Sequence, residues 1–229
     1  MNPDSGQLIL SFSRFDFSVV QIDDGLQTAS AGRHSGPIVF LSCSGSPQKL
    51  ISASMDGSIG IWDPSGRRLH LLQEHRCPIV NASLSGDGRS LATFAASGIG
   101  FLWNVDDGRR IRELPRHLDA VHSVHFFRDG KSLLTASRSS GVRIFDLIAA
   151  AEKTVPSDSQ IVSADVSPDG HWLLMIVSVM TEAGAPSKAI LRNMETDSNL
   201  VLPTEGTLKM AEFRPAGGSV VRGGHPEGV

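Results

Sequence analysis

The sequence predicts an all-β fold assembled from repeated four-stranded antiparallel sheets. Three observations lead to this prediction: short alternating apolar runs, turn residues between them, and a spacing of 40 to 42 residues at which both recur. The chain has 229 residues, of which 40% are hydrophobic, and it contains 23 glycines. Brief strands joined by tight turns fit this composition, and no stretch carries the apolar period of a capped helix.

The first strand of the repeat is an apolar run that begins at Ile38 and returns at Ile79, Val121 and Ile161. Successive copies are 41, 42 and 40 residues apart, and a fainter copy begins at Leu208. An Asp-Gly pair follows three of the copies. Asp-Gly between apolar runs is a strong hairpin signal, because glycine adopts the positive φ that tight turns require. Each copy therefore starts a predicted antiparallel hairpin.

The third strand of the repeat follows the same period. It ends in an aromatic residue, at Trp62, Trp103 and Phe145, with spacings of 41 and 42 residues. Three such strands and a connecting outer strand give one four-stranded sheet per period. A single sheet of this size cannot bury both faces, so neighbouring sheets must stack around a common axis. The prediction is a β-propeller.

The repeat resembles the WD-repeat family. That family has a histidine near the start of each repeat and Trp-Asp at the end of the third strand. Here His34, His75 and His117 fill the histidine position, and Trp-Asp occurs intact as Trp62-Asp63. The glycine that usually precedes the histidine is absent, and Trp-Asp is weakened in the other repeats. The resemblance implies a β-propeller whose rim binds partner proteins.

The period divides the chain into predicted blades of a single domain, 1–229. Partial blades are expected at 7–23 and at 200–222, and four full blades lie between them: 26–63, 66–104, 109–146 and 151–194. About five blades are present if the two ends combine, within the usual range for propellers. The interpretation we favour is an incomplete ring of seven blades, the usual number in the family that the repeat resembles.

The resemblance also implies a buried hydrogen-bond network that staples a blade together. Its expected members are Asp56, His34, Trp62 and one serine, Ser52 or Ser54. A buried indole N–H and a buried imidazole need hydrogen-bond partners, and a nearby carboxylate fixes the histidine tautomer.

Two further blades carry parts of the same network. His75 and Trp103 hold the corresponding positions in one blade, and His117 holds the histidine position in the next. Ser97 and Ser139 stand where the first network has its aspartate. We therefore expect these two networks to be incomplete.

A candidate partner-binding rim follows from the propeller prediction. Loops before the first strand and between the second and third strands border one end of the central channel. The residues expected there are Phe15, Met55, Arg76, Asp119 and Arg138. Phe15 and Met55 are apolar residues in turns that usually favour glycine or polar side chains. They are candidate interface anchors, with incidental surface residues as the alternative.

The sequence offers no catalytic residue, metal site or cofactor motif. It has no nucleophile elbow, His-Glu-x-x-His motif, phosphate loop or dinucleotide fingerprint. His34, His75 and His117 belong to different blades, while His122 and His125 are expected on opposite faces of one strand. The 21 basic and 24 acidic residues give a net charge of −3. No bulk basic field is present to attract nucleic acid.

The densest basic stretch contains Arg109, Arg110, Arg112 and Arg116, on the predicted outer strand of a blade. Charges at a sheet edge discourage edge-to-edge pairing, so a solvated edge is the preferred interpretation. The alternative is a docking patch for an acidic partner or for a phosphoinositide head group, which would require Arg109 and Arg110 to share a pocket.

These observations predict a non-catalytic, protein-binding scaffold. The alternative is a regulatory propeller domain of a larger enzyme, for example a hydrolase whose catalytic part lies outside this chain, because Ser-Pro-Asp-Gly at 167–170 also occurs in propellers of such enzymes. Cys43 and Cys77 form no disulfide framework, which favours an intracellular, cytoplasmic or nuclear location. No apolar run is long enough to span a membrane.

Overall fold

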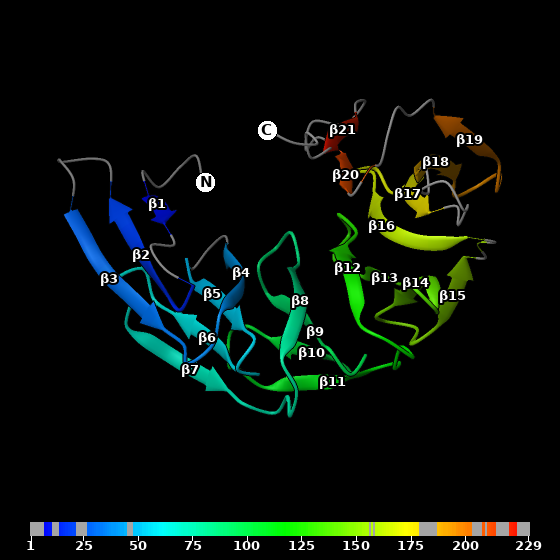
Figure 1. Ribbon diagram of the computed structural model, residues 1–229. Helices are drawn as coiled ribbons and strands as arrows, with labels where there is room; N and C mark the ends of the chain where they lie inside the picture. Colours follow the sequence, from blue (N-terminus) through cyan, green and yellow to red (C-terminus); the bar gives the residue numbers. More distant parts are fainter. Residues whose placement is uncertain are drawn as a thin grey trace. The chain divides into compact units, whose positions relative to one another are not determined.

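The structure is a computed structural model, and it describes residues 7–10, 14–21, 27–44, 48–155, 157, 159–178, 187–202, 208, 210–213 and 220–223. Strands are the regular elements of these residues, and all of their pairings are antiparallel (Figure 1). The all-β prediction is confirmed. No helix with the length and apolar character of a membrane span occurs among the described residues.

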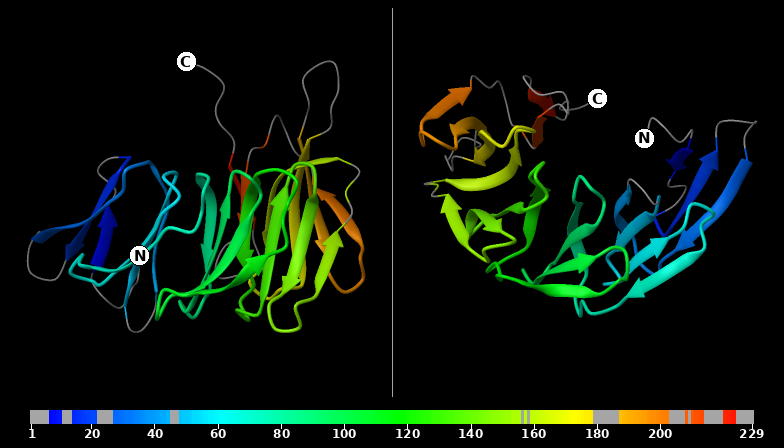
Figure 2. Two further views of the ribbon diagram at one scale, coloured as in Figure 1. Left: turned by 90° about the horizontal axis from the view of Figure 1, so that it is seen from below. Right: turned by 180° about the vertical axis from the view of Figure 1, so that it is seen from behind.

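Four sheets contain four strands each, and strands that are consecutive in sequence are hydrogen-bonded neighbours (Figure 2). The first consists of β4 (Ile38–Cys43), β5 (Leu50–Ser54), β6 (Ile59–Trp62) and β7 (Arg68–Leu72). The second consists of β8 (Ile79–Leu84), β9 (Ser90–Ala95), β10 (Gly100–Asn104) and β11 (Arg110–Leu114). The third consists of β12 (Val121–Phe126), β13 (Ser132–Ser137), β14 (Gly141–Asp146) and β15 (Glu152–Val155). The fourth consists of β16 (Gln160–Val166), β17 (Trp172–Ser178), β18 (Ser187–Asn193) and β19 (Asn199–Leu202).

Smaller sheets flank these four in the sequence. On the N-terminal side, β1 (Gln7–Leu10), β2 (Asp16–Gln21) and β3 (Gln27–Arg33) form a three-stranded sheet. On the C-terminal side, β20 (Met210–Phe213) pairs with β21 (Val220–Gly223). Parts of the predicted partial blades, such as 22–23 and 214–219, lie outside the described residues. The single domain and the union of the two ends into one blade stay predictions.

The sheets and the sequence repeats are offset by one strand. Strand β7 lies within the expected blade 66–104, but it pairs with β6 of the preceding repeat. A tight turn causes this pairing: the Asp63 carboxylate accepts hydrogen bonds from the backbone N–H groups of Ser65 and Arg67, and Gly66 adopts a φ of 84°. Because a short turn makes an antiparallel hairpin, each repeat donates its outer strand to the sheet before it.

An irregularity of pairing repeats with the sequence. The first strand of each four-stranded sheet shifts register just after its first apolar residue, a β-bulge. The shifts lie between Ile38 and Phe40, Ile79 and Asn81, Val121 and Ser123, and Ile161 and Ser163. These positions coincide with the repeated apolar runs, so the four sheets are structurally equivalent blades.

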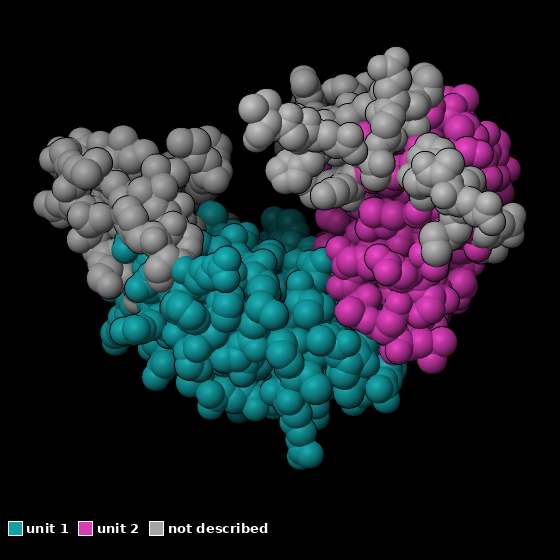
Figure 3. Space-filling view, viewed as in Figure 1, with its two compact units in different colours: residues 1–116 teal, residues 117–229 magenta. Residues whose placement is uncertain are grey.

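The chain divides into two compact units, residues 1–116 and residues 117–229 (Figure 3). Strands β1 to β11 belong to unit 1, and strands β12 to β21 belong to unit 2.

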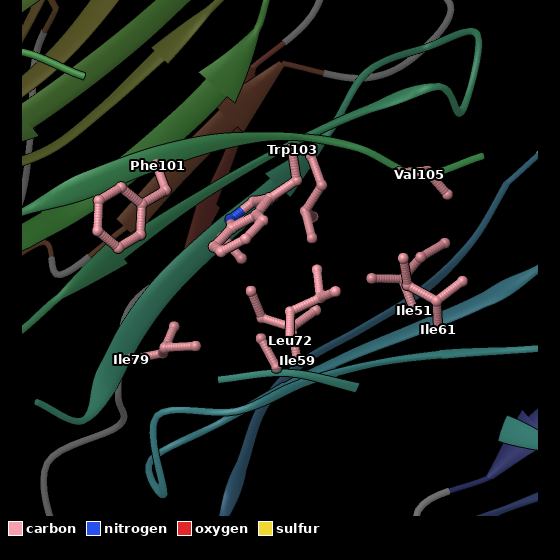
Figure 4. Packing of buried hydrophobic residues seen from close by; sticks show 11 residues of the cluster. Ile51, Ile59, Ile61, Leu72, Ile79, Phe101, Trp103 and Val105 are labelled. Atoms are coloured by element: carbon pink, nitrogen blue, oxygen red, sulfur yellow. The ribbon is translucent and has the colours of Figure 1, made fainter. Parts of the chain in front are cut away.

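In unit 1, a hydrophobic cluster fills the space between the sheets β4–β7 and β8–β11 (Figure 4). Ile59 and Ile61 on β6 are fully buried there, and Trp103 on β10 is 1% exposed. Alternate residues of a strand share one face, so the alternating pattern delivers these side chains to the same layer. In unit 2, Leu134 and Met175 belong to a similar cluster between β12–β15 and β16–β19. Neighbouring sheets bury each other's apolar faces, as the propeller prediction required.

A buried lysine also ties the first two blades together. Lys49, just before β5, is 9% exposed, and its Nζ lies 2.8 Å from Oδ1 of Asp106. The same Nζ donates to the carbonyl oxygen of Val105 at 3.2 Å. A buried ammonium group is tolerated when it is paired and hydrogen-bonded, and this one has both kinds of partner.

Candidate functional site

A chain of side-chain hydrogen bonds crosses the sheet β4–β7. Trp62 Nε1 donates to Ser52 Oγ at 2.9 Å, and the same oxygen lies 2.7 Å from His34 Nε2. On the other side of the imidazole, His34 Nδ1 lies 2.8 Å from Ser58 Oγ. Ser58 Oγ in turn donates to Oδ1 of Asp56 at 2.6 Å. The network therefore runs from an indole to a carboxylate through two hydroxyl groups and one imidazole.

The tautomer of this histidine follows from counting protons. A serine hydroxyl has one proton, and Ser58 gives its proton to an ionised carboxylate that has none. Nδ1 of the imidazole must therefore be the donor to Ser58, and Nε2 of the neutral ring accepts from Ser52. Ser54 is not part of the chain, because its hydroxyl donates to the carbonyl oxygen of Gly36 at 2.9 Å.

The electrostatics of the site keep this arrangement at neutral pH. Burial opposes ionisation of Asp56, but hydrogen bonds from Ser58 and Ser35 outweigh it and hold the pKa of Asp56 well below its usual range. Ser35 contributes both its backbone N–H, at 2.8 Å, and its hydroxyl, at 2.9 Å. Burial lowers the pKa of His34, and the charge of Asp56 only partly opposes that shift. A neutral imidazole thus faces an ionised carboxylate.

The sheet β8–β11 contains only the first half of the network. Trp103 Nε1 donates to Thr93 Oγ1 at 2.8 Å, and that oxygen lies 2.8 Å from His75 Nε2. Ile99 and Ser97 occupy the positions of the relay serine and the aspartate. Within the described residues, Thr93 is the side-chain hydrogen-bond partner of His75. This bond involves Nε2 of the imidazole and not Nδ1. Burial lowers the pKa of His75 to about 4.

The sheet β12–β15 reaches a carboxylate by another path. His117 Nε2 lies 2.8 Å from Thr135 Oγ1, and Nδ1 lies 3.1 Å from Ser137 Oγ. The carboxylate is Asp119, which accepts from the backbone N–H of Ser139 at 3.1 Å. Burial opposes ionisation of Asp119, but hydrogen bonds from Ser137 and Ser139 hold its pKa below the usual range. The acid comes from the loop before the first strand, whereas Asp56 comes from the hairpin turn.

Two features of this third network depart from the expectation. The sequence predicts an incomplete network here because Ser139 replaces the aspartate, and it places Asp119 on the rim. An acid two residues after the histidine was the signal that could have indicated the alternative path. Phe145 stands in for tryptophan and packs edge-on against His117, with ring centroids 6.4 Å apart. Burial, with the charge of Arg143, lowers the pKa of His117 to about 4.

In unit 1, two apolar residues of the predicted rim lie on adjacent turns. Phe15, before β2, is 40% exposed, and Met55, between β5 and β6, is 43% exposed. The carbonyl oxygen of Phe15 accepts from the N–H of His34 at 2.8 Å, and the N–H of Met55 donates to Pro37 at 2.8 Å. Both turns are therefore fixed to one segment, residues 34–37. A hollow of about 500 Å³ beside this segment is lined by Phe15, Arg33, His34 and Ser35.

Arg76, the third rim residue of unit 1, lies in the loop between β7 and β8 and is exposed. The turn that carries Met55 contacts this loop closely: a Cβ atom at Gly57 would lie 2.9 Å from the carbonyl oxygen of His75. Phe15, Met55 and Arg76 thus come from neighbouring loops.

The rim residues of unit 2 are Asp119 and Arg138. Arg138 is exposed in the turn between β13 and β14. The hydrogen bond between the Ser139 N–H and Asp119 joins that turn to the loop before β12. Asp119 and Arg138 are therefore close neighbours on joined loops.

Arg109, just before β11, and Arg110, on β11, have different surroundings. Arg110 lies 3.0 Å from the carboxylate of Glu74, and its guanidinium stacks 4.8 Å from the ring centroid of Phe101. The side chain of Arg109 is 85% exposed and reaches Asp107 at 4.0 Å. The strand is an outer strand of its sheet, as the solvated-edge interpretation expects. No cluster of three or more potential metal-ligating His, Cys, Asp or Glu side chains is present in the described part of the chain.

Comparison with known proteins identifies the repeat. The WD40 family, described as "WD domain, G-beta repeat", matches residues 27–63 and 108–146. The chain is 22% identical over 204 residues to "Periodic tryptophan protein 2" of Saccharomyces cerevisiae, which is 79% of this chain and 22% of that protein. It is 27% identical over 81 residues to "SIR4-interacting protein SIF2" of the same yeast, 35% of this chain and 15% of that protein. It is 36% identical over 101 residues to "Retinoblastoma-binding-like protein E" of Dictyostelium discoideum, 42% of this chain and 19% of that protein.

The chain contains WD repeats at residues 27–63 and 108–146, and its four-stranded sheets are consistent with the blades of a β-propeller. The family matches, the equivalent sheets and the histidine spacing agree on this assignment. The chain spans less than a quarter of the length of these three relatives.

Proposed function

We propose that this chain is a non-catalytic scaffold that binds partner proteins or peptides through the rim residues Phe15, Met55 and Arg76 of unit 1. The observation that carries the proposal is the exposure of two large apolar side chains, 40% and 43%, on neighbouring turns. Backbone hydrogen bonds anchor both turns to one segment. A rigid apolar surface loses little conformational entropy on binding, which favours association.

The composition of the surface and the printed names of relatives support the same proposal. Arginine is enriched in protein interfaces, and an exposed arginine stands beside the apolar pair. Two relatives carry names that describe an interaction with another protein, SIR4-interacting protein SIF2 and Retinoblastoma-binding-like protein E. The two cysteines, Cys43 and Cys77, are both free thiols, which supports a place of action inside the cell, in the cytoplasm or the nucleus.

The test is affinity capture by the full chain from an extract of its source cells, with quantitative mass spectrometry of the captured proteins. The variant Phe15→Ser/Met55→Ser should recover about tenfold less partner, because central apolar anchors carry most of the binding energy. Leu200→Ser/Val201→Ser is the matched control, since these residues of β19 are exposed at 56% and 58% but lie far from the rim in sequence.

Equal recovery by the rim variant and the control, with both variants folded, would contradict the proposal. Arg138→Ala alone tests the candidate rim residue of unit 2 separately. A loss of partner indicates that unit 2 also binds, and unchanged recovery restricts the binding surface to unit 1.

A further inference from the structure

A pocket of about 460 Å³ lies beside the incomplete network of the sheet β8–β11, within unit 1. The loop between β7 and β8 lines it with His75 and Arg76. The turn between β9 and β10 contributes Ser97 and Ile99, and the outer strand β11 contributes Arg110. Two of its lining residues, Ser97 and Ile99, are equivalent to Asp56 and Ser58. The pocket therefore lies where, in the sheet β4–β7, the network continues to its carboxylate.

In two other sheets, Nδ1 of the imidazole lies beside a serine hydroxyl, and an acid lies close to that serine. In the sheet β4–β7, Ser58 donates to Asp56. In the sheet β12–β15, Ser137 contacts His117 Nδ1, and Asp119 accepts from the backbone N–H of Ser139. In β8–β11 the two possible serine positions carry Ala95 and Ile99, and the aspartate position carries Ser97. This sheet therefore lacks both the relay and the acid.

Two polar groups at the pocket are left without partners by these replacements. The hydroxyl oxygen of Ser97 is buried and has no hydrogen-bond partner among the described residues. His75 is 8% exposed, and its bonded nitrogen is Nε2, so no described side chain satisfies Nδ1. A buried polar group without a partner costs about 1–3 kcal/mol. Two such groups around one pocket indicate that an acceptor from outside the chain completes the site.

The charges around the pocket favour an anionic acceptor. Arg76 is exposed, and it has no ion-pair partner within the described residues. Glu74 is neutralised by Arg110 at 3.0 Å, and Glu113 is the other acid of the lining. Arg116 adds a further positive charge, because its Nε donates to the carbonyl oxygen of Ser97 at 3.3 Å. Three guanidinium groups thus surround two carboxylates, which leaves the site net positive.

We propose that this pocket binds the side-chain carboxylate of an aspartate or glutamate of a partner protein. The carboxylate accepts from Nδ1–H of His75 and from the hydroxyl of Ser97, with Arg76 as its counter-charge. It completes from outside the network that Asp56 completes within the sheet β4–β7. The inference rests on the proposed scaffold function for the identity of its ligand, but its geometry is independent of Phe15 and Met55.

The first experiment uses the full chain labelled with ¹⁵N-histidine and follows the His75 resonance by NMR, assigned with His75→Gln. The probe is N-acetylglutamic acid α-amide, and N-acetylglutamine amide is the uncharged control. The acid probe should shift the His75 resonance and move its titration midpoint upward, because a bound carboxylate stabilises the imidazolium. An equal response to both probes, or no response to either, overturns the proposal and assigns the pocket to water.

The second experiment supplies the missing acid from within the chain. Ser97→Asp/Ile99→Ser recreates the pair formed by Asp56 and Ser58, and it should weaken binding of the acid probe at least about tenfold. Ser139→Asp, at the equivalent position of the sheet β12–β15, is the matched control and should bind the probe as the wild type does. Arg76→Ala, at an exposed position that leaves the fold intact, should also weaken binding. Undiminished binding by the double variant and by Arg76→Ala overturns the proposal.

The two proposals fail separately. If partner capture depends on Phe15 and Met55 but the probe gives no response at His75, only the proposed carboxylate site is contradicted. If the probe gives a response but capture does not depend on Phe15 and Met55, only the proposed rim surface is contradicted.

Discussion

The sheets β4–β7 and β8–β11 share one half of a network and differ in the other. In both sheets, an indole N–H and an imidazole nitrogen form hydrogen bonds with the same hydroxyl group. That hydroxyl belongs to Ser52 for Trp62 and to Thr93 for Trp103. Only the first sheet continues to a carboxylate. The shared half lies in the buried layer between strands, whereas the other half lies at the loops. The buried half of the network, from tryptophan to histidine, is therefore sufficient to link the strands of a blade. The half at the loops is then available for binding.

The sheet β12–β15 shows that the acid has no fixed origin. Asp119 comes from the loop before the first strand, and Asp56 comes from the hairpin turn, yet each accepts from a serine that contacts the imidazole. What the network requires is an anionic acceptor at one point in space. That requirement can be met from either loop, and in β8–β11 neither loop meets it.

The largest expected effect tests the shared half. Trp103→Ala should destabilise the protein by about 3–5 kcal/mol, because it removes a fully packed indole and leaves a cavity. Trp62→Ala should cost a similar amount. Ile111→Ala, at a residue that is 53% exposed on β11, is the control and should stay within about 0.5 kcal/mol. Chemical denaturation measures all three, and a Trp103 cost near that of the control would refute the packing argument.

The second prediction compares the halves that differ. Asp56→Ala should cost about 2 kcal/mol, because the donors of Ser35 and Ser58 lose their acceptor. Ser97→Ala at the equivalent position should not destabilise the protein and should raise the free energy of unfolding by about 1 kcal/mol or more, since it removes a buried hydroxyl that has no partner. Equal costs at the two positions would show that the carboxylate is not what distinguishes the blades.

The third prediction concerns pH. The folded state holds the pKa of His75 at about 4, against an ordinary value of 6.5, so below pH 6.5 the unfolded chain binds a proton that the folded chain does not. Stability should therefore fall as pH decreases from 6.5 to about 4. His75→Gln should reduce this slope by at most about 1.4 kcal/mol per pH unit, the value for one proton. Thermal unfolding measured across this range checks it; near pH 8 the two proteins should show parallel profiles.

The smallest expected effect restores the missing half. Ser97→Asp/Ile99→Ser should stabilise the protein by about 1 kcal/mol, because the imidazole and the relay hydroxyl gain partners. Ser97→Asp alone should stabilise the protein less, since Ile99 has no hydroxyl to link the imidazole to the new carboxylate. A double variant less stable than the single variant in urea denaturation would argue against the relay.

Local patterns explain what could be predicted. Strands, turns and the repeat follow from alternation and from Asp-Gly hairpins, which involve residues close in sequence. The positions of His34 and Trp62 follow from the repeat. The choice between Ser52 and Ser54 could not be made, because both belong to the same strand and only the folded sheet aligns one of them with the imidazole.

The sequence by itself determined the class of fold, the period of the blades and the residues that each blade brings to its buried layer, because period-two alternation and tight turns are short-range properties of the chain. Only the tertiary structure decided that each repeat gives its outer strand to the preceding sheet, that Asp119 replaces the missing aspartate, and that a pocket opens beside His75. The first of these features depends on which sheet edge the outer strand pairs with, and the other two depend on contacts between residues about 20 positions apart, such as Asp119 and Ser139. Their geometry exists only after the strands have paired.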